Sequence, residues 1–243
     1  MNLEMTTVSS QTGGLIPENH TLSQHLTTSP LTKTLIDTAR DGTQLLKVGK
    51  GAPRVMLISG IHGNELPPQI SAVRLINEIN RLKLSGTIYI IPFAIPKATM
   101  KNSRRFGGFD MNRSAFKQGT ITNDILKLLK SLKIDAMADF HSTQKNSNPG
   151  VQSVFCSKKP CYESFKMAKY IAEITSSKVI CQEKAGTLFT GALEDESNLA
   201  GIPAVTCEVV SNNGWVGKGS PERSYLQMRT FLEYTGIKIH ESR

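Results

Sequence analysis

The chain has 243 residues, a formal net charge of +9, a mean hydropathy of -0.21 and a hydrophobic fraction of 39%. No stretch approaches the roughly 20 apolar residues of a membrane span, and the first residues lack the apolar core of a secretory signal, so no membrane partner is predicted. The basic residues are scattered and only 6% of residues are aromatic, which argues against a nucleic-acid-binding face with a stacking platform.

The N-terminal residues 1–30 are rich in Ser and Thr without an apolar period, and we expect a loosely ordered leader or an edge segment there. The remainder, residues 31–243, is predicted to be one hydrolase domain, because no linker or internal repeat interrupts it. Within this domain, Thr34–Ala39 and Thr43–Val48 flank the tripeptide Arg-Asp-Gly. This pattern predicts a hairpin around an Asp-Gly turn.

The central predicted strand is Val55–Ser59, an apolar and partly β-branched run typical of a buried strand. Two glycines interrupt the run, and two prolines then stand where a helix tolerates proline best. A helix with one apolar stripe is therefore predicted over 67–82. The almost wholly apolar run 87–95 predicts a strand that is covered on both faces.

Helices and strands alternate through the second half of the chain. Helices are predicted at 122–132, 162–175 and 221–234, and strands at 134–140, 151–156, 178–182 and 204–210. This alternation predicts an α/β fold with a doubly wound, mostly parallel mixed sheet and helices on both faces. A long polar loop over 96–116 is unusual inside a compact domain and is therefore a candidate for function.

Reactive side chains follow several predicted strands. In such a sheet, ligands bind in the crevice beyond the carboxyl ends of strands. His62 and Glu65 follow the central strand, His141 ends a later one, and Glu208 lies in an apolar run where an unpartnered carboxylate is costly. Each of these residues alone has an ordinary structural explanation. Together, two histidines and one carboxylate match the ligand set of a catalytic zinc site that keeps a fourth position open.

Four segments carry a family resemblance: G-I-H-G-N-E, R-F-G-G-F-D-M-N-R, F-H-S and C-E-V, in this order within residues 54–212. In this order they resemble the zinc carboxypeptidase superfamily, most closely its aspartoacylase and succinylglutamate desuccinylase branch. The resemblance implies one Zn²⁺ per chain, held by His62, Glu65 and His141, with Glu208 as the general base and acid.

The resemblance also implies roles for residues of the long loop. Arg105 is expected to polarise the scissile carbonyl in preference to its neighbour Arg104, because seven residues separate Arg105 from Asn112 as in aspartoacylase-like proteins. Asn112 and Arg113 are expected to hold a carboxylate of the substrate. The chain ends soon after its last predicted helix, so no sizeable C-terminal β domain is expected, which leaves selectivity for aspartate or glutamate open.

An acidic triplet precedes the last predicted strand: Glu194, Asp195 and Glu196. Because charged residues are mostly exposed, a solvated acidic turn is the favoured interpretation. The alternative is that the triplet favours a cationic leaving group in a neighbouring pocket.

The leading hypothesis is a zinc-dependent amide hydrolase (a deacylase) that cleaves an N-acyl amino acid or a similar small amide bearing a carboxylate. The first alternative is a metallocarboxypeptidase that acts on peptides. More distant ones are a phosphate- or nucleotide-binding module at residues 60–65, which lacks a G-x-G-x-x-G or G-K-[ST] motif, and a nucleic-acid binder. Four cysteines without C-x-x-C spacing predict free thiols in a reducing compartment, hence a cytoplasmic location. The acyl group, the amino acid, the exact metal and the oligomeric state stay open.

Overall fold

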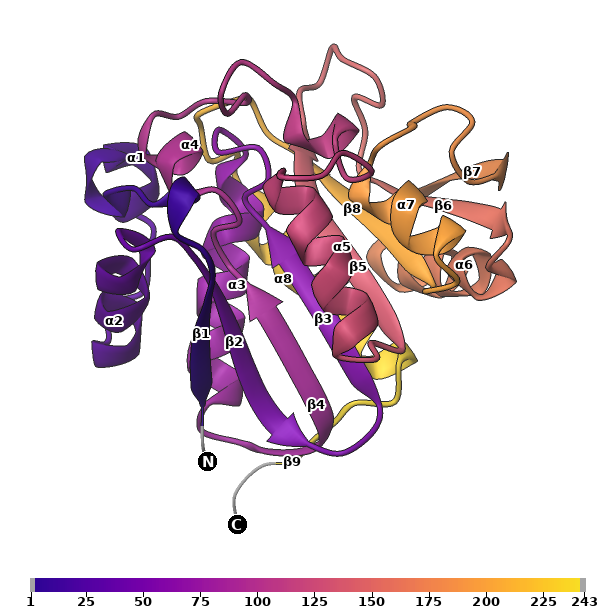
Figure 1. Cartoon of the computed structure of the whole chain (residues 1–243), viewed down its shortest axis with the longest axis horizontal. Coiled ribbons are helices and arrows are strands. Elements are labelled where there is room, and N and C mark those ends of the chain that lie inside the picture. The colour runs from indigo at the N-terminus through magenta and orange to yellow at the C-terminus, as the bar shows by residue number, and fades with distance from the viewer. Residues whose placement is uncertain (1–2, 241–243) are drawn as a thin grey trace.

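A mixed β-sheet forms the centre of the computed structural model, which describes residues 3–240, and helices cover both of its faces (Figure 1). The strands are β1 (Glu4–Ser9), β2 (Thr43–Lys50), β3 (Arg54–Ser59), β4 (Lys83–Ile91), β5 (Ala136–Thr143), β6 (Ser153–Lys159), β7 (Lys178–Lys184), β8 (Ala204–Val210) and β9 (Lys238–His240). The helices are α1 (His20–Ser23), α2 (Pro30–Ala39), α3 (Leu66–Ile79), α4 (Pro96–Met100), α5 (Ile121–Ser131), α6 (Tyr162–Thr175), α7 (Leu193–Leu199) and α8 (Ser220–Tyr234).

The strand order is β1-β2-β4-β3-β5-β8-β6-β7, and β9 pairs with the start of β4. The central strands β4, β3, β5 and β8 run parallel to one another, and antiparallel strands flank them on both sides. The predicted fold class, an α/β fold with a mixed sheet and helices on both faces, is confirmed. No helix within residues 3–240 is both long and apolar enough to cross a bilayer.

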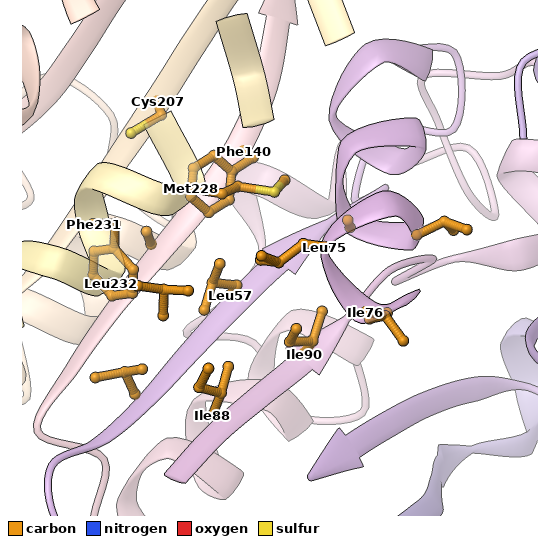
Figure 2. Close-up of a cluster of buried hydrophobic side chains, with 14 of the residues drawn as sticks. Leu57, Leu75, Ile76, Ile88, Ile90, Phe140, Cys207, Met228, Phe231 and Leu232 are labelled. Carbon is orange, nitrogen blue, oxygen red and sulfur yellow. The ribbon is translucent and has the colours of Figure 1, made fainter. Parts of the chain in front are cut away.

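The central strand β3 is buried on both faces, as its continuous apolar run predicts. Val55 and Leu57 face the cluster under α3 and α8, whereas Met56 and Ile58 face the cluster under α5. Figure 2 shows the first of these clusters, in which side chains from the strands pack against helices α3 and α8. The carboxyl end of β3 is therefore held rigidly, and this is where the predicted ligands begin.

The predicted hairpin around Asp41-Gly42 is wrong, because its first arm is helix α2. The Ser29 hydroxyl caps this helix by accepting a hydrogen bond from the Thr32 backbone N–H (2.9 Å), and Pro30 stands in the first turn, where proline is tolerated. Leu35 and Ala39 are buried. The helix-starting residues Ser29 and Pro30 at the start of α2 had a stronger effect than the turn residues Asp41 and Gly42. Strand β2 therefore pairs with β1 and β4 and not with the segment before the turn.

Two segments that were expected to be loose or loop-like contain regular elements. In the N-terminal segment, β1 forms an edge of the sheet, which agrees with the second of the two expectations for it, and Ile16 and Leu22 are fully buried in the core. The Asn19 side chain donates a hydrogen bond to the Thr99 carbonyl (2.8 Å), which joins this segment to α4. The long polar loop begins with α4 and includes a short 3-10 turn at Met111–Arg113.

Candidate metal centre

The loop between β3 and α3 carries His62 and Glu65, and neighbouring backbone holds it closely. A Cβ atom at Gly63 would lie 2.0 Å from the Ala98 carbonyl carbon, so only glycine fits there. The Gln69 amide of α3 donates a hydrogen bond to the Glu65 carbonyl oxygen (2.9 Å). The loop conformation therefore fixes where both side chains point.

Strands β5 and β8 supply the other two predicted residues. They pair in parallel with His141 directly beside Glu208 in the register. The backbone N–H of Ser142 donates a hydrogen bond to Oε2 of Glu65 (3.0 Å), which ties the loop after β3 to the end of β5. Four residues from three separate parts of the sequence thus meet at the carboxyl ends of three neighbouring strands.

The three predicted metal ligands form one buried cluster. Nδ1 of His62 lies 2.8 Å from Oε1 of Glu65, and Nδ1 of His141 lies 2.7 Å from Oε2 of the same carboxylate. One donor atom from each residue lies within 4.8 Å of the others, and each residue is at most 3% exposed. Two imidazole nitrogens and a carboxylate at this spacing could hold a single metal ion.

A second carboxylate lies behind each imidazole. Nε2 of His62 is 2.8 Å from Oδ1 of Asp110, and Nε2 of His141 is 2.7 Å from Oδ2 of Asp139. A metal ion binds the neutral form of an imidazole, in which the single N–H is donated to the outer carboxylate and the Nδ1 lone pair is left for the metal. A cation on this side would also be attracted by the Glu65 carboxylate, so the donor set fits a divalent metal. Outer carboxylates of this kind orient histidine ligands in metal sites.

The pKa values of the cluster reflect its charges. Burial alone would raise the pKa of Glu65, but the charges of His62 and His141 hold it well below its usual range. Burial would lower the pKa of His141, but the carboxylates of Asp139 and Glu65 raise it well above its usual range. The charges of the cluster therefore favour the ionised carboxylate of Glu65 and the protonated imidazole of His141.

Glu208 is the unpaired acid of the site. Its Oε2 atom is shielded from solvent and has no hydrogen-bond partner among residues 3–240. Burial and the negative charge of Glu65 raise the pKa of Glu208 to about 8. A carboxyl group beside the candidate ligands thus holds its proton more tightly than an ordinary glutamate does, which suits a group that carries a proton.

A cavity of about 320 Å³ opens onto this cluster. Its walls comprise the cluster, the long loop, the loop after β5, and parts of β6, α7 and β8; they include His62, Glu65, Arg104, Asn112, Arg113, His141, Ser142, Phe155, Phe189, Glu194, Thr206, Glu208 and Asn213. Six of the seven residues that the sequence singled out as site residues therefore line one cavity, and Arg105 is not among its lining residues.

The two neighbouring arginines point in different directions. Arg104 donates hydrogen bonds to Oε1 of Glu65 (2.9 Å) and Oδ2 of Asp110 (3.4 Å) and lines the cavity. Arg105 donates a hydrogen bond to the Gly108 carbonyl oxygen (3.0 Å) within its own loop. The position beside the metal ligands that the sequence assigned to Arg105 is occupied by Arg104.

Asn112 and Arg113 both line the cavity, from the 3-10 turn of the long loop. Oδ1 of Asn112 accepts a hydrogen bond from the Leu193 backbone N–H (3.0 Å), so the amide nitrogen points toward His141, 3.3 Å from its Nε2. The Arg113 guanidinium lies over the Phe189 ring, 5.3 Å from the ring centroid. Neither side chain forms an ion pair within the described residues.

Sequence reasoning missed three features of the site. Asp139 stands two residues before His141 and therefore on the same side of the strand, so the D-x-H spacing could have revealed it. Asp110 belongs to the segment R-F-G-G-F-D-M-N-R, but no role was expected for it. The expected solvated acidic turn is wrong, because Glu194 and Asp195 are only 2% and 0% exposed.

Comparisons with known proteins identify the family of the chain. A sequence model of the succinylglutamate desuccinylase/aspartoacylase catalytic domain matches residues 51–218. No curated protein sequence matches the chain.

Three solved structures show the same fold. The chain is similar to an aspartoacylase family protein from Mesorhizobium loti (19% identity, TM-score 0.62, 80% of this chain and 62% of that one). It is similar to the tripeptide-bound cell shape determinant Csd4 from Helicobacter pylori (15% identity, TM-score 0.66, 83% and 57%). It also resembles a metallo-carboxypeptidase from Burkholderia cenocepacia (16% identity, TM-score 0.55, 79% and 60%).

The chain spans between 57% and 62% of the length of these three proteins. At these identities, the solved structures establish the fold alone. The match of the family model over residues 51–218, which covers more than half of the chain, establishes the family. The chain belongs to the succinylglutamate desuccinylase/aspartoacylase catalytic-domain family.

Proposed function

We propose that this chain is a zinc-dependent amide hydrolase that removes the acyl group from an N-acyl amino acid or a similar small amide bearing a carboxylate. The observation that carries the proposal is the buried meeting of His62, Glu65 and His141, with the unpaired carboxyl group of Glu208 beside them. Membership of the desuccinylase/aspartoacylase family supports hydrolysis of an amide bond.

His62, Glu65 and His141 would hold one Zn²⁺ per chain, with Asp110 and Asp139 orienting the two imidazoles. When bound in such a site, zinc lowers the pKa of a water ligand to about 7 and polarises a carbonyl oxygen. Two histidines and one carboxylate leave room for both water and substrate. This ligand set is characteristic of catalytic rather than structural zinc.

Glu208 would act as the proton carrier. As the carboxylate, it accepts a proton from the attacking water, and as the acid it returns that proton to the leaving amine. Its raised pKa, which follows from burial and from the Glu65 charge, suits it to holding the proton between these two steps.

Arg104 would stabilise the negative charge that develops on the scissile carbonyl oxygen. Its guanidinium is held at the metal cluster by Glu65 and Asp110, so it is oriented before substrate binds. Arg105 lies away from the cavity and takes no part in this proposal, although the loop spacing had favoured it.

Asn112 and Arg113 would hold the substrate carboxylate. Since the single N–H on Nε2 of His141 is directed at Asp139, that nitrogen cannot accept a hydrogen bond from Asn112. The Asn112 amide is thus a free donor at the cavity wall. Arg113 adds a planar guanidinium, which suits bidentate binding of a carboxylate.

A metallocarboxypeptidase is the second candidate, because the same residues would cleave the last peptide bond of a short peptide. The structure of Csd4, which shares the fold, contains a bound tripeptide. We further propose a cytoplasmic location, because all four cysteines are free in the structure, as expected in a reducing compartment.

The experiment is metal analysis of purified protein together with an amidase screen over N-acyl amino acids and short peptides. One zinc per chain and turnover of N-acyl amino acids but not peptides is the expected result. His141→Ala should lose both zinc and activity, whereas His25→Ala, at an exposed histidine, should keep both. Activity that is unaffected by zinc removal, or by His141→Ala, would refute the proposal.

A further inference from the structure

The wall of the cavity holds a buried carboxyl group that the chemistry above does not use. Glu194, the second residue of α7, lines the cavity and is only 2% exposed. Its Oε1 atom accepts a hydrogen bond from the Asn198 amide (2.6 Å). Asn198 is itself held by the backbone of Ala204, whose carbonyl oxygen accepts from it (3.0 Å) and whose N–H donates to it (3.1 Å). Glu194 is therefore held rigidly in place.

No cation neutralises Glu194 within the described residues. It forms no ion pair with Lys, Arg or His there, and its neighbour Asp195 is a second buried carboxyl group. Burial and the charge of Asp195 raise the pKa of Glu194 well above its usual range. Burying a carboxyl group without a cation is costly, so a ligand that brings a positive charge would gain from this position.

The other charged groups of the cavity are already committed. Arg104 is paired with Glu65 at the metal cluster, and Glu208 lies beside the metal ligands. Among the described lining residues, this leaves Arg113 as the cation without an ion pair and Glu194 as an acid without one. The two do not pair with each other, although both line the same cavity. A ligand with a carboxylate and a separate positive charge would match them both.

An apolar surface lies in the same cavity. Phe155 and Phe189 both line it and stack edge to face, with ring centroids 5.3 Å apart. Phe155 of β6 pairs with Thr206 of β8, which places this surface at the strands next to α7. Aromatic rings of this kind suit the methylene groups of an amino acid side chain.

We propose that Glu194 selects substrates whose leaving amino acid carries a cationic side chain, that is, a diamino acid such as ornithine or lysine. The α-carboxylate binds Arg113, and the side-chain ammonium binds Glu194. This inference rests on the proposed amide hydrolase function and specifies its substrate class. The inference replaces the expectation that residues 194–196 form a solvated acidic turn.

The test compares two substrates that differ in one charged group: Nα-acetyl-ornithine and Nα-acetyl-norvaline. For the zinc-loaded wild-type protein, kcat/KM should be roughly ten- to hundredfold higher for the ornithine compound, as expected for a charged hydrogen bond. Glu194→Gln keeps the acceptor for Asn198 but removes the charge, so most of this preference should disappear without a loss of thermal stability. A purely structural role for Glu194 would not change the ratio between the two substrates.

Glu196→Gln is the matched control. Glu196 belongs to the same triplet but is half-buried, accepts a hydrogen bond from the Gly191 N–H (3.2 Å) and is not among the cavity-lining residues. This variant should keep the preference for the ornithine compound. Equal loss of preference in both variants, or a wild-type preference for the norvaline or an acetylated glutamate compound, would overturn the inference while leaving the amide hydrolase proposal intact.

A binding measurement can test the role of Glu194 even if the proposed hydrolase function is wrong. If the zinc-loaded protein hydrolyses no amide, the proposed function fails, and calorimetric titration with free L-ornithine and L-norvaline still tests the cavity. Tighter binding of ornithine that is lost in Glu194→Gln supports the selection of a cation. Equal binding of both amino acids, or of neither, refutes it.

Discussion

Asp139 and His141 lie on the same side of β5, and Oδ2 of Asp139 is 2.7 Å from Nε2 of His141. The pair is buried, with exposures of 0% and 2%. Because strand residues two apart point in the same direction, local geometry alone brings these side chains together. The carboxylate orients the imidazole so that Nδ1 faces Glu65, and this relationship organises the candidate metal centre.

Substituting Asp139 should therefore weaken metal binding without removing a ligand. We expect Asp139→Asn to reduce zinc affinity roughly 10- to 100-fold, because the amide holds the imidazole less firmly and makes it a weaker base. Competition with a chromogenic chelator measures this affinity. Asp124→Asn, in an exposed pair with Lys127, is the control and should bind zinc like the wild type. Identical affinities in all three proteins would contradict the role of Asp139.

The two adjacent arginines should differ in their effect on turnover. Arg104→Ala removes the guanidinium that is held at the metal cluster, and we expect kcat to fall roughly 100- to 1000-fold. Arg105→Ala should change kcat by less than about threefold, because this side chain donates its hydrogen bond to the Gly108 carbonyl of its own loop. Steady-state kinetics, with zinc content measured for each variant, checks the difference. A larger loss in Arg105→Ala would restore the assignment made from loop spacing.

Catalysis and substrate binding should respond to different substitutions. Glu208→Gln removes the proton carrier, so kcat should fall by roughly 100-fold or more with little change in KM. Arg113→Ala removes a carboxylate partner and should chiefly raise KM. Kinetics with the best substrate from the amidase screen measures both constants. Similar losses of kcat at constant KM in both variants would disprove this division of roles.

Glu208 should make the metal-free protein less stable at high pH. Its pKa is raised from 4.5 to about 8 in the folded state, so the folded state binds the proton more tightly than the unfolded state. The stability that this proton contributes is fully present below pH 4.5 and is lost as the pH rises toward 8. We expect metal-free Glu208→Gln to exceed the wild type by about 2–4 kcal/mol in unfolding free energy at pH 9, and by almost nothing at pH 4.

Urea unfolding in the presence of a chelator, repeated across this pH range, measures the difference. Asp124→Asn, at a carboxyl group that is in an exposed pair with Lys127 and is not among the cavity-lining residues, is the comparison variant. A stability difference that does not change with pH would show that Glu208 titrates normally in the folded chain.

Zinc should stabilise the fold through the same cluster. At a free zinc concentration about 100 times its dissociation constant, binding adds about 2.7 kcal/mol, which corresponds to a rise of roughly 5–10 °C in Tm. A chelator should reverse the rise, and Mg²⁺ should produce little of it, because Mg²⁺ prefers oxygen ligands. Differential scanning calorimetry checks this. A similar rise in His141→Ala would place the zinc elsewhere on the chain.

Local patterns in the sequence were enough to predict most of the framework. The continuous apolar run of β3 and the matching run of β8 mark strands that are buried on both faces, because such strands have no solvent side. The carboxyl ends of these strands also marked the edge of the sheet where the candidate site lies. The hairpin prediction failed at α2, where a local turn signal competed with a stronger helix start at Ser29 and Pro30.

The sequence by itself identified the groups at the centre of the candidate site, two histidines and an acid at strand ends with a further acid in β8, but not the carboxylates of Asp110 and Asp139 behind the histidines. Only the tertiary structure decided between Arg104 and Arg105, because the direction of a loop side chain depends on contacts with distant residues such as Glu65. It also decided that Glu194 is buried, because burial depends on what packs over a residue rather than on its own charge. Strand periodicity is local and can be read in order along the chain, whereas loop direction and burial are set by elements far away in the sequence.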